Sequence, residues 1–280
     1  MKNLVFWVIT LNLTFFLFYF SCTKEVTIAP NTPKEVVNIS GYGSNGGGAS
    51  DSLCVFSTEG QQHNDGLEFI YGRLAIENAD WSEEGAFQEV ETAYYDYVTD
   101  SLGFTSTEAN DNLNLLKTYQ DALFEDDLYR ITFVLDSIGV DIIDINTLVE
   151  ITTVLDSTYS DFDELLEALS EKENEIVAQD RMTEIVELSI NGLKASICYW
   201  SNNLDRWEEN IPILQPRWCN HNKKWFWETV NSMTEDDFWG FAVGAGMGAI
   251  IGGVGAAPGS VAGAFYSSAA SGIKGLFKGC

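Results

Sequence analysis

The chain has 280 residues, with 15 basic against 42 acidic side chains and a net charge of −27 at neutral pH. The electrostatic field of so much negative charge repels nucleic acid and anionic surfaces, so we predict no nucleic-acid partner. A hydrophobic fraction of 45% with 13% aromatic residues excludes general disorder and indicates a folded body with its own core.

The N-terminus has the pattern of an export signal. Lys2 precedes an uncharged, strongly apolar run over residues 4–20, and Ser21 follows that run. A charged start, a short apolar segment and a small residue at the break are typical of a secretory signal peptide. We therefore assign residues 1–21 to a signal peptide.

The segment Tyr19-Phe20-Ser21-Cys22 resembles the lipobox of bacterial lipoproteins, in the Phe-Ser-Cys form of the Bacteroidota. It departs from the stricter pattern, which has Leu where Tyr19 stands. The resemblance implies cleavage before Cys22 and lipidation of that cysteine, with membrane lipid as a partner. Because Thr23 stands where an inner-membrane retention signal has Asp, we expect the outer membrane, with the face left open. The alternative is an uncleaved anchor helix with an incidental cysteine.

Residues 22–52 predict a flexible, lipid-anchored linker. This segment is polar and turn-rich, with Pro30, Pro33 and a glycine-rich run over residues 41–48. Such a composition behaves as a flexible coil. The folded body would then stand away from its lipid anchor.

Residues 53–231 predict one acidic, all-α domain, a helical bundle. Apolar residues recur at helical spacing in several segments. Ser82 is a predicted N-cap, Thr107 precedes a further helix, and Asp161 with Glu164 has capping-box spacing. The clearest helix has apolar residues at steps of three and four: Met182, Val186, Ile190, Leu193, Ile197, Trp200, Leu204 and Trp207. We expect that helix to lie at the centre of the bundle, buried along one stripe.

One short segment recurs: residues 131–137 and 151–157 share the pattern Ile-Thr-x-Val-Leu-Asp-Ser. Two copies are too few for a solenoid. Either a pair of similar helices or chance accounts for them.

The sequence contains no recognisable catalytic motif, so we predict that the protein is not an enzyme and has no cofactor. His63 stands before an amphipathic helix, but a general base needs a positioned partner, and its role stays open. The acidic clusters lack EF-hand spacing, and Cys219 with His221 lacks a second pair of ligands. We therefore predict no metal site.

Four cysteines follow Cys22: Cys54, Cys198, Cys219 and Cys280. Four cysteines allow three pairings, which sequence alone does not separate. An exported compartment permits disulfides. Cys198 with Cys219 is the most local candidate.

Six of the eight tryptophans lie between residues 200 and 239. Indole rings favour the boundary between membrane and water, which gives a set of candidate interface aromatics: Trp218, Trp225, Trp227 and Trp239. Core packing, which the helical phase of Trp200 and Trp207 favours, and a carbohydrate-stacking platform are the alternatives.

Residues 232–280 predict a glycine-zipper hairpin. Half of the 24 glycines lie in residues 240–279, where no acidic residue occurs. The candidate packing positions, interrupted by Pro258, are Gly240, Gly244, Gly248, Gly252, Gly255, Gly259 and Gly263. The segment resembles the glycine-zipper hairpins of envelope lipoproteins and the glycine-rich tails of class II bacteriocins. That resemblance implies close helix pairing in a membrane or self-association; a hairpin packed against the body, or a loose tail, is the alternative.

Three hypotheses for function result. The first is a non-enzymatic lipoprotein of the cell envelope with a structural or interaction role. The second is a bacteriocin-like factor whose hairpin enters a target membrane. The third is a surface module that binds a glycan or a peptide through its aromatic residues.

Overall fold

The computed structural model describes residues 49, 53–75, 82–124, 128–159, 161–210, 223–250 and 254–278. The chain divides into two compact units, residues 1–34 and 35–280, and every described residue belongs to the second. Several sequence predictions lie outside the described residues: the signal peptide, Cys22, the linker except Ala49, Trp218, Cys219, Gly252 and the side chain of Trp225.

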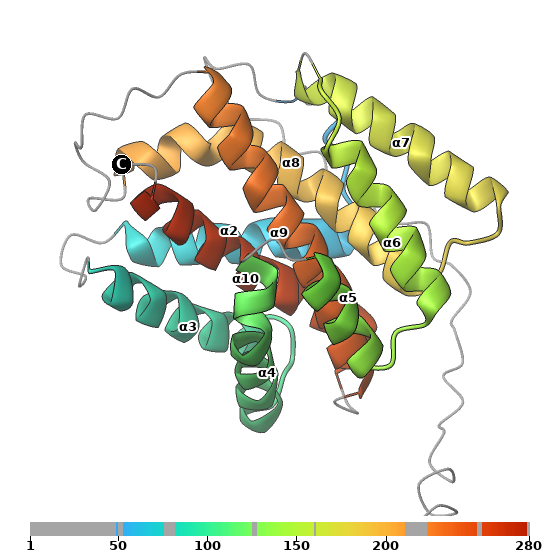
Figure 1. The fold of residues 1–280 in the computed structure, drawn as a ribbon. Coiled ribbons are helices and arrows are strands. Elements are labelled where there is room, and N and C mark those ends of the chain that lie inside the picture. The colour runs from blue at the N-terminus through green and yellow to red at the C-terminus, as the bar shows by residue number, and fades with distance from the viewer. Residues whose placement is uncertain are drawn as a thin grey trace, which may run out of the picture. The chain divides into compact units, whose positions relative to one another are not determined.

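The described residues form nine α-helices and no strand, which confirms the predicted all-α bundle (Figure 1). In chain order they are α2 (Thr58–Leu74), α3 (Glu83–Asp100), α4 (Ser106–Phe124), α5 (Leu128–Ser137), α6 (Ile142–Leu155), α7 (Phe162–Ala178), α8 (Glu184–Asn210), α9 (Lys223–Ile250) and α10 (Ala256–Lys278).

Side-chain caps explain where several helices begin. Ser82 accepts a hydrogen bond from the Gly85 N–H at the start of α3, and Asp161 accepts one from Glu164 N–H at 3.0 Å at the start of α7. Both predicted caps are confirmed. Helix α4 begins at Ser106, one residue before the predicted Thr107, because Thr105 and Glu108 form a reciprocal capping box there.

The predicted central helix is α8. Its apolar stripe from Val186 to Trp207 is buried, and both of its tryptophans are fully buried. The repeated segments are the last turns of α5 and α6, where the matching isoleucine, valine and leucine of each copy are buried. The two copies are therefore similar helices.

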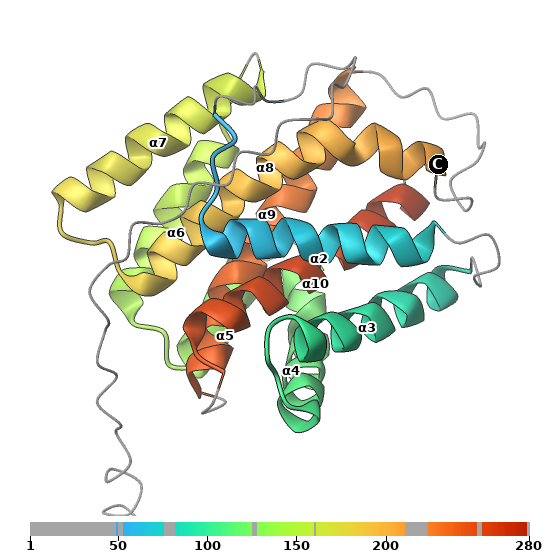
Figure 2. The same ribbon diagram turned by 180° about the vertical axis from the view of Figure 1, so that it is seen from behind.

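Helices α9 and α10 form an antiparallel hairpin in the middle of the bundle. Figure 1 shows them between α3 and α4 on one side and α6 and α7 on the other, and Figure 2 shows α2 and α8 lying side by side across them. Every residue from 237 to 248 and from 259 to 273 is buried. A helix that is buried all round belongs to the core of a protein or to a membrane span. None of the described helices is both long enough and apolar enough to span a membrane.

The hairpin is not a separate module. Helix α9 runs without a break through residues 231 and 232, where we expected a domain boundary. Because α8 packs on α9, and α2 and α3 pack on α10, the hairpin provides a large part of the core of the same unit.

Glycines make the contact between α9 and α10. A Cβ atom on Gly244 would overlap the carbonyl oxygen of Gly259, one on Gly248 would overlap that of Gly255, and one on Gly263 would overlap that of Gly240. The two backbones therefore touch directly. Gly255, with a φ of 85°, also lies just before α10 in a conformation that other residues rarely adopt.

Substitution by alanine should have opposite effects in the hairpin and on the surface. Gly244→Ala should lower the free energy of unfolding by about 1–3 kcal/mol, because the methyl group has no room. Gly72→Ala in α2, where nothing lies within 4 Å, should raise it by about 1 kcal/mol, because alanine is the better helix former. Denaturant unfolding of both variants measures this. A Gly244→Ala protein as stable as Gly72→Ala would contradict the close backbone contact.

Candidate functional site

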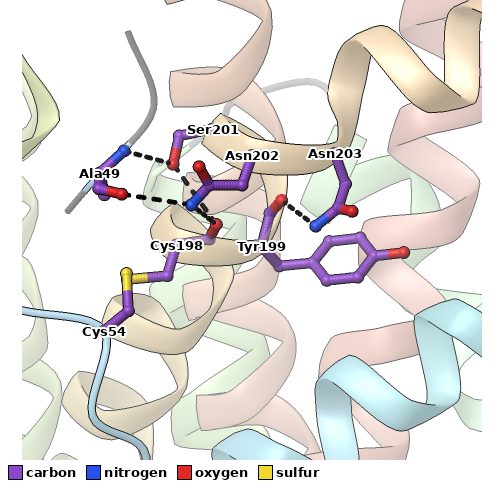
Figure 3. Close-up of a disulfide and its surroundings, with 7 residues drawn as sticks. All are labelled: Ala49, Cys54, Cys198, Tyr199, Ser201, Asn202 and Asn203. Atoms are coloured by element: carbon purple, nitrogen blue, oxygen red, sulfur yellow. Dashed lines mark hydrogen bonds between the residues drawn. A yellow bond between two sulfur atoms is a disulfide. The ribbon is translucent and has the colours of Figure 1, made fainter. Parts of the chain in front are cut away.

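A disulfide fixes the segment before α2 to the middle of α8. Cys54 is bonded to Cys198, with the two Cα atoms 5.8 Å apart and a sequence separation of 144 (Figure 3). The predicted pairing of Cys198 with Cys219 is therefore wrong. Local spacing favoured it, but packing of α2 against α8 brings Cys54 to Cys198.

A pocket of about 360 Å³ lies beside this disulfide. That volume falls in the range of small-molecule sites, about 300–1,000 Å³. The pocket is lined by the segment before α2, by one face of α2 and by one face of α8: Cys54, Phe56, Gln61, Asn64, Asp65, Glu68, Cys198, Tyr199, Asn202 and Asn203. The α2 residues follow i, i+3, i+4, i+7 spacing, so they share one helix face.

One end of the pocket holds a chain of polar contacts. The Trp207 indole N–H donates to the Tyr199 hydroxyl at 2.9 Å, and that hydroxyl donates to Glu68 at 2.9 Å. Glu68 also pairs with Arg206, whose guanidinium lies 4.3 Å from the centre of the Tyr71 ring. Burial raises the pKa of Tyr199 well above its usual value, so its hydroxyl stays protonated and holds Glu68 in place.

The pocket adjoins a second, fully buried polar cluster through Asn64 and His63. Asn64 lines the pocket, and its side-chain oxygen lies 2.9 Å from Nδ1 of His63. Nε2 of His63 lies 3.4 Å from Oδ2 of Asp237 on α9, too poorly aligned for a hydrogen bond. Ser196 on α8 and Ser268 on α10 both donate to that same carboxylate oxygen. Histidine 63 thus lies in the core, with a partner that sequence did not reveal.

This cluster is not arranged as a catalytic triad. In a triad the histidine takes a proton from a serine and is oriented by a carboxylate. Here Ser196 and Ser268 both donate to Asp237, and Ser268 also accepts from the Trp200 indole N–H at 2.8 Å. The histidine and carboxylate side chains are both fully buried. The cluster is placed to hold α2, α8, α9 and α10 together.

Comparison with protein-family models, curated proteins and solved structures finds no match to this chain. Function must therefore be inferred from the described side chains themselves.

The tryptophans take three different positions. Trp200, Trp207 and Trp239 are buried in the core, as the core-packing alternative predicted, and the membrane-interface hypothesis does not fit Trp239. Trp227 is half-buried and stacks on Phe162, with ring centres 3.9 Å apart. That contact occupies one face of the Trp227 indole ring.

The predicted packing glycines meet one another. Three glycines on α9 contact two on α10 and one just before it: Gly240, Gly244 and Gly248 on one side, Gly255, Gly259 and Gly263 on the other. Their partner in this structure is the same chain. The pocket residues on α2 could have been noticed in the sequence as one polar face, but such faces usually point into solvent.

Non-reducing peptide mapping should recover a Cys54–Cys198 peptide. Replacing both cysteines by alanine should lower the free energy of unfolding by about 4–5 kcal/mol, because the bond closes a very long loop in the unfolded chain. A mapped Cys198–Cys219 peptide would refute the pairing.

Removing the buried carboxylate should be costly. Asp237→Ala leaves His63, Ser196 and Ser268 without their shared partner, and we expect a loss of about 3–5 kcal/mol in the free energy of unfolding. Asp205→Ala, on the exposed side of α8, is the matched control and should change little. Equal stability of the two variants in thermal and denaturant unfolding would contradict a bonding role for Asp237.

Proposed function

We propose that this chain is a lipid-anchored, non-catalytic binding protein of the bacterial cell envelope. Its helical body takes a small polar ligand, or a short polar group of a larger one, in the pocket between α2 and α8. The pocket beside the Cys54–Cys198 disulfide is the observation that carries this proposal.

The proposed cell-envelope compartment and the proposed lipid anchor rest on two independent features. The Phe-Ser-Cys segment ending at Cys22 resembles a lipobox, and a disulfide bridging distant segments suits an oxidising compartment outside the cytoplasm. The outer membrane is the proposed location.

The position of the hairpin favours an anchor made by lipid alone. The described packing glycines of α9 and α10 already contact one another inside the body. Asp237, at the start of the buried stretch of α9, accepts a hydrogen bond from Ser196 of α8. Leaving the body would break these contacts and expose a large part of the core. A role in which the hairpin enters a membrane therefore receives no support from this arrangement.

Palmitate labelling of the full chain in bacterial cells, with and without globomycin, tests the anchor. We expect label on the wild-type chain, none on Cys22→Ala, and release of that variant from the membrane fraction, because its hairpin stays within the body. Asp205→Ala, which keeps Cys22 and the disulfide and changes an exposed side chain, is the control and should retain its label. Firm membrane attachment of Cys22→Ala would overturn the proposal that lipid is the only anchor.

A further inference from the structure

Two asparagines turn their oxygens away from the helix that carries them. The Asn202 side-chain nitrogen donates to the carbonyl oxygens of Cys198 and Ala49, at 2.8 and 3.4 Å, and the Asn203 nitrogen donates to that of Tyr199 at 2.8 Å (Figure 3). A carbonyl oxygen only accepts, so the nitrogens must face it. No described residue donates to the Oδ1 atom of either asparagine, and both asparagines line the pocket.

Gln61 on the opposite wall is oriented in the same way. Its nitrogen donates to Asp65 at 2.7 Å, and its Oε1 is buried with no hydrogen-bond partner among the described residues. An unpaired buried acceptor costs about 1–3 kcal/mol. The only pocket amide nitrogen among these residues that stays free belongs to Asn64, which is 5% exposed.

The pocket also has an excess of negative charge. Arg206 neutralises Glu68, but no cationic side chain of the described residues pairs with Asp65. The net charge of −27 for the whole chain adds a field that attracts cations.

The remaining wall is apolar. Cys54 and Cys198 of the disulfide, with Phe56 and Tyr199, belong to the lining, and such residues suit an aliphatic stem rather than a bare ion. Among the described residues no group of three or more His, Cys, Asp or Glu side chains is placed to hold a metal ion.

We propose that the pocket binds an organic cation with N–H donors, a primary ammonium or a guanidinium carried on an aliphatic stem. The charged head pairs with Asp65, whose carboxylate is oriented by the hydrogen bond from Gln61, and donates to the free oxygens of Asn202 and Asn203. The stem lies along the disulfide and the aromatic rings. This inference rests on the proposed binding function and names the ligand class of the same pocket.

Free diamines and the side chains of lysine or arginine in a peptide share this chemistry. Calorimetric titration of the full chain with cadaverine, with agmatine and with Nα-acetyl-lysine N-methylamide separates the two sources. Binding of the first two alone indicates a free amine, and binding of the capped lysine indicates a peptide side chain. In either case added salt should weaken binding, because opposite charges attract less when screened.

Variants locate the site. Asp65→Asn should weaken binding about tenfold, because it removes a charge-assisted hydrogen bond, and Asp65→Lys should abolish binding by placing an ammonium in the pocket. Asp65 is exposed, so both variants should fold, which circular dichroism checks. Asp205→Asn removes the same charge from outside the pocket and should leave the affinity unchanged.

The two proposals fail in different ways. N-acetylglucosamine or acetate binding in place of the amines, with loss on Asp65→Lys, would overturn the cation assignment and retain a binding pocket. Amine binding that is equal in wild type, Asp65→Asn and Asp205→Asn would overturn the assignment to this site. A ligand-observed NMR screen compares the binding of amines, sugars and carboxylates to wild type and to Asp65→Lys. If the substitution changes the binding of none of them, the proposed binding function itself fails.

Discussion

The direct contact between the backbones of α9 and α10 is the constraint on which the fold depends. Gly244 and Gly259 leave no space for a side chain between the two helices. Two helices this close form a narrow, mostly apolar pair that other helices can cover on several sides. Helices α2, α3 and α8 pack around it. Glycine is a poor helix former in water, so burial must supply the stability that propensity does not.

Close packing of small residues does not by itself fix how the hairpin sits in the body. Apolar contacts are non-directional, whereas the bonds at Asp237 have defined donors: Ser196 from α8 and Ser268 from α10, with Trp200 bonded to Ser268. A shift of α9 by one turn would break both hydrogen bonds to Asp237 and leave a buried carboxylate unpaired. The polar cluster therefore sets the register of the hairpin, at the cost of burying polar groups.

Helical class, most caps and the stripe of α8 could be predicted because they depend on residues close in sequence. The partner of the packing glycines could not be predicted from the sequence, because a helix face made of glycines can pack equally well against lipid, another copy of the chain or the other helix of its own hairpin. The disulfide joins positions 144 residues apart, and only the packing of α2 on α8 selects it. The sequence around His63 likewise did not reveal its buried partner, because Asp237 lies on a helix far away in the sequence.

Asn64 lines the pocket and also contacts His63 of the buried cluster, so it connects the pocket with the core. The Asp237 carboxylate calls for an N–H from Nε2 of His63 rather than a lone pair, since two acceptors facing each other repel. If Nε2 alone carries the proton, Nδ1 becomes an acceptor, and Asn64 must turn its nitrogen to the histidine and its oxygen to the pocket. If Nδ1 carries a hydrogen, the Asn64 oxygen accepts it and the Asn64 nitrogen faces the pocket. The position of the hydrogen on the His63 ring thus decides whether Asn64 offers the pocket a donor or an acceptor.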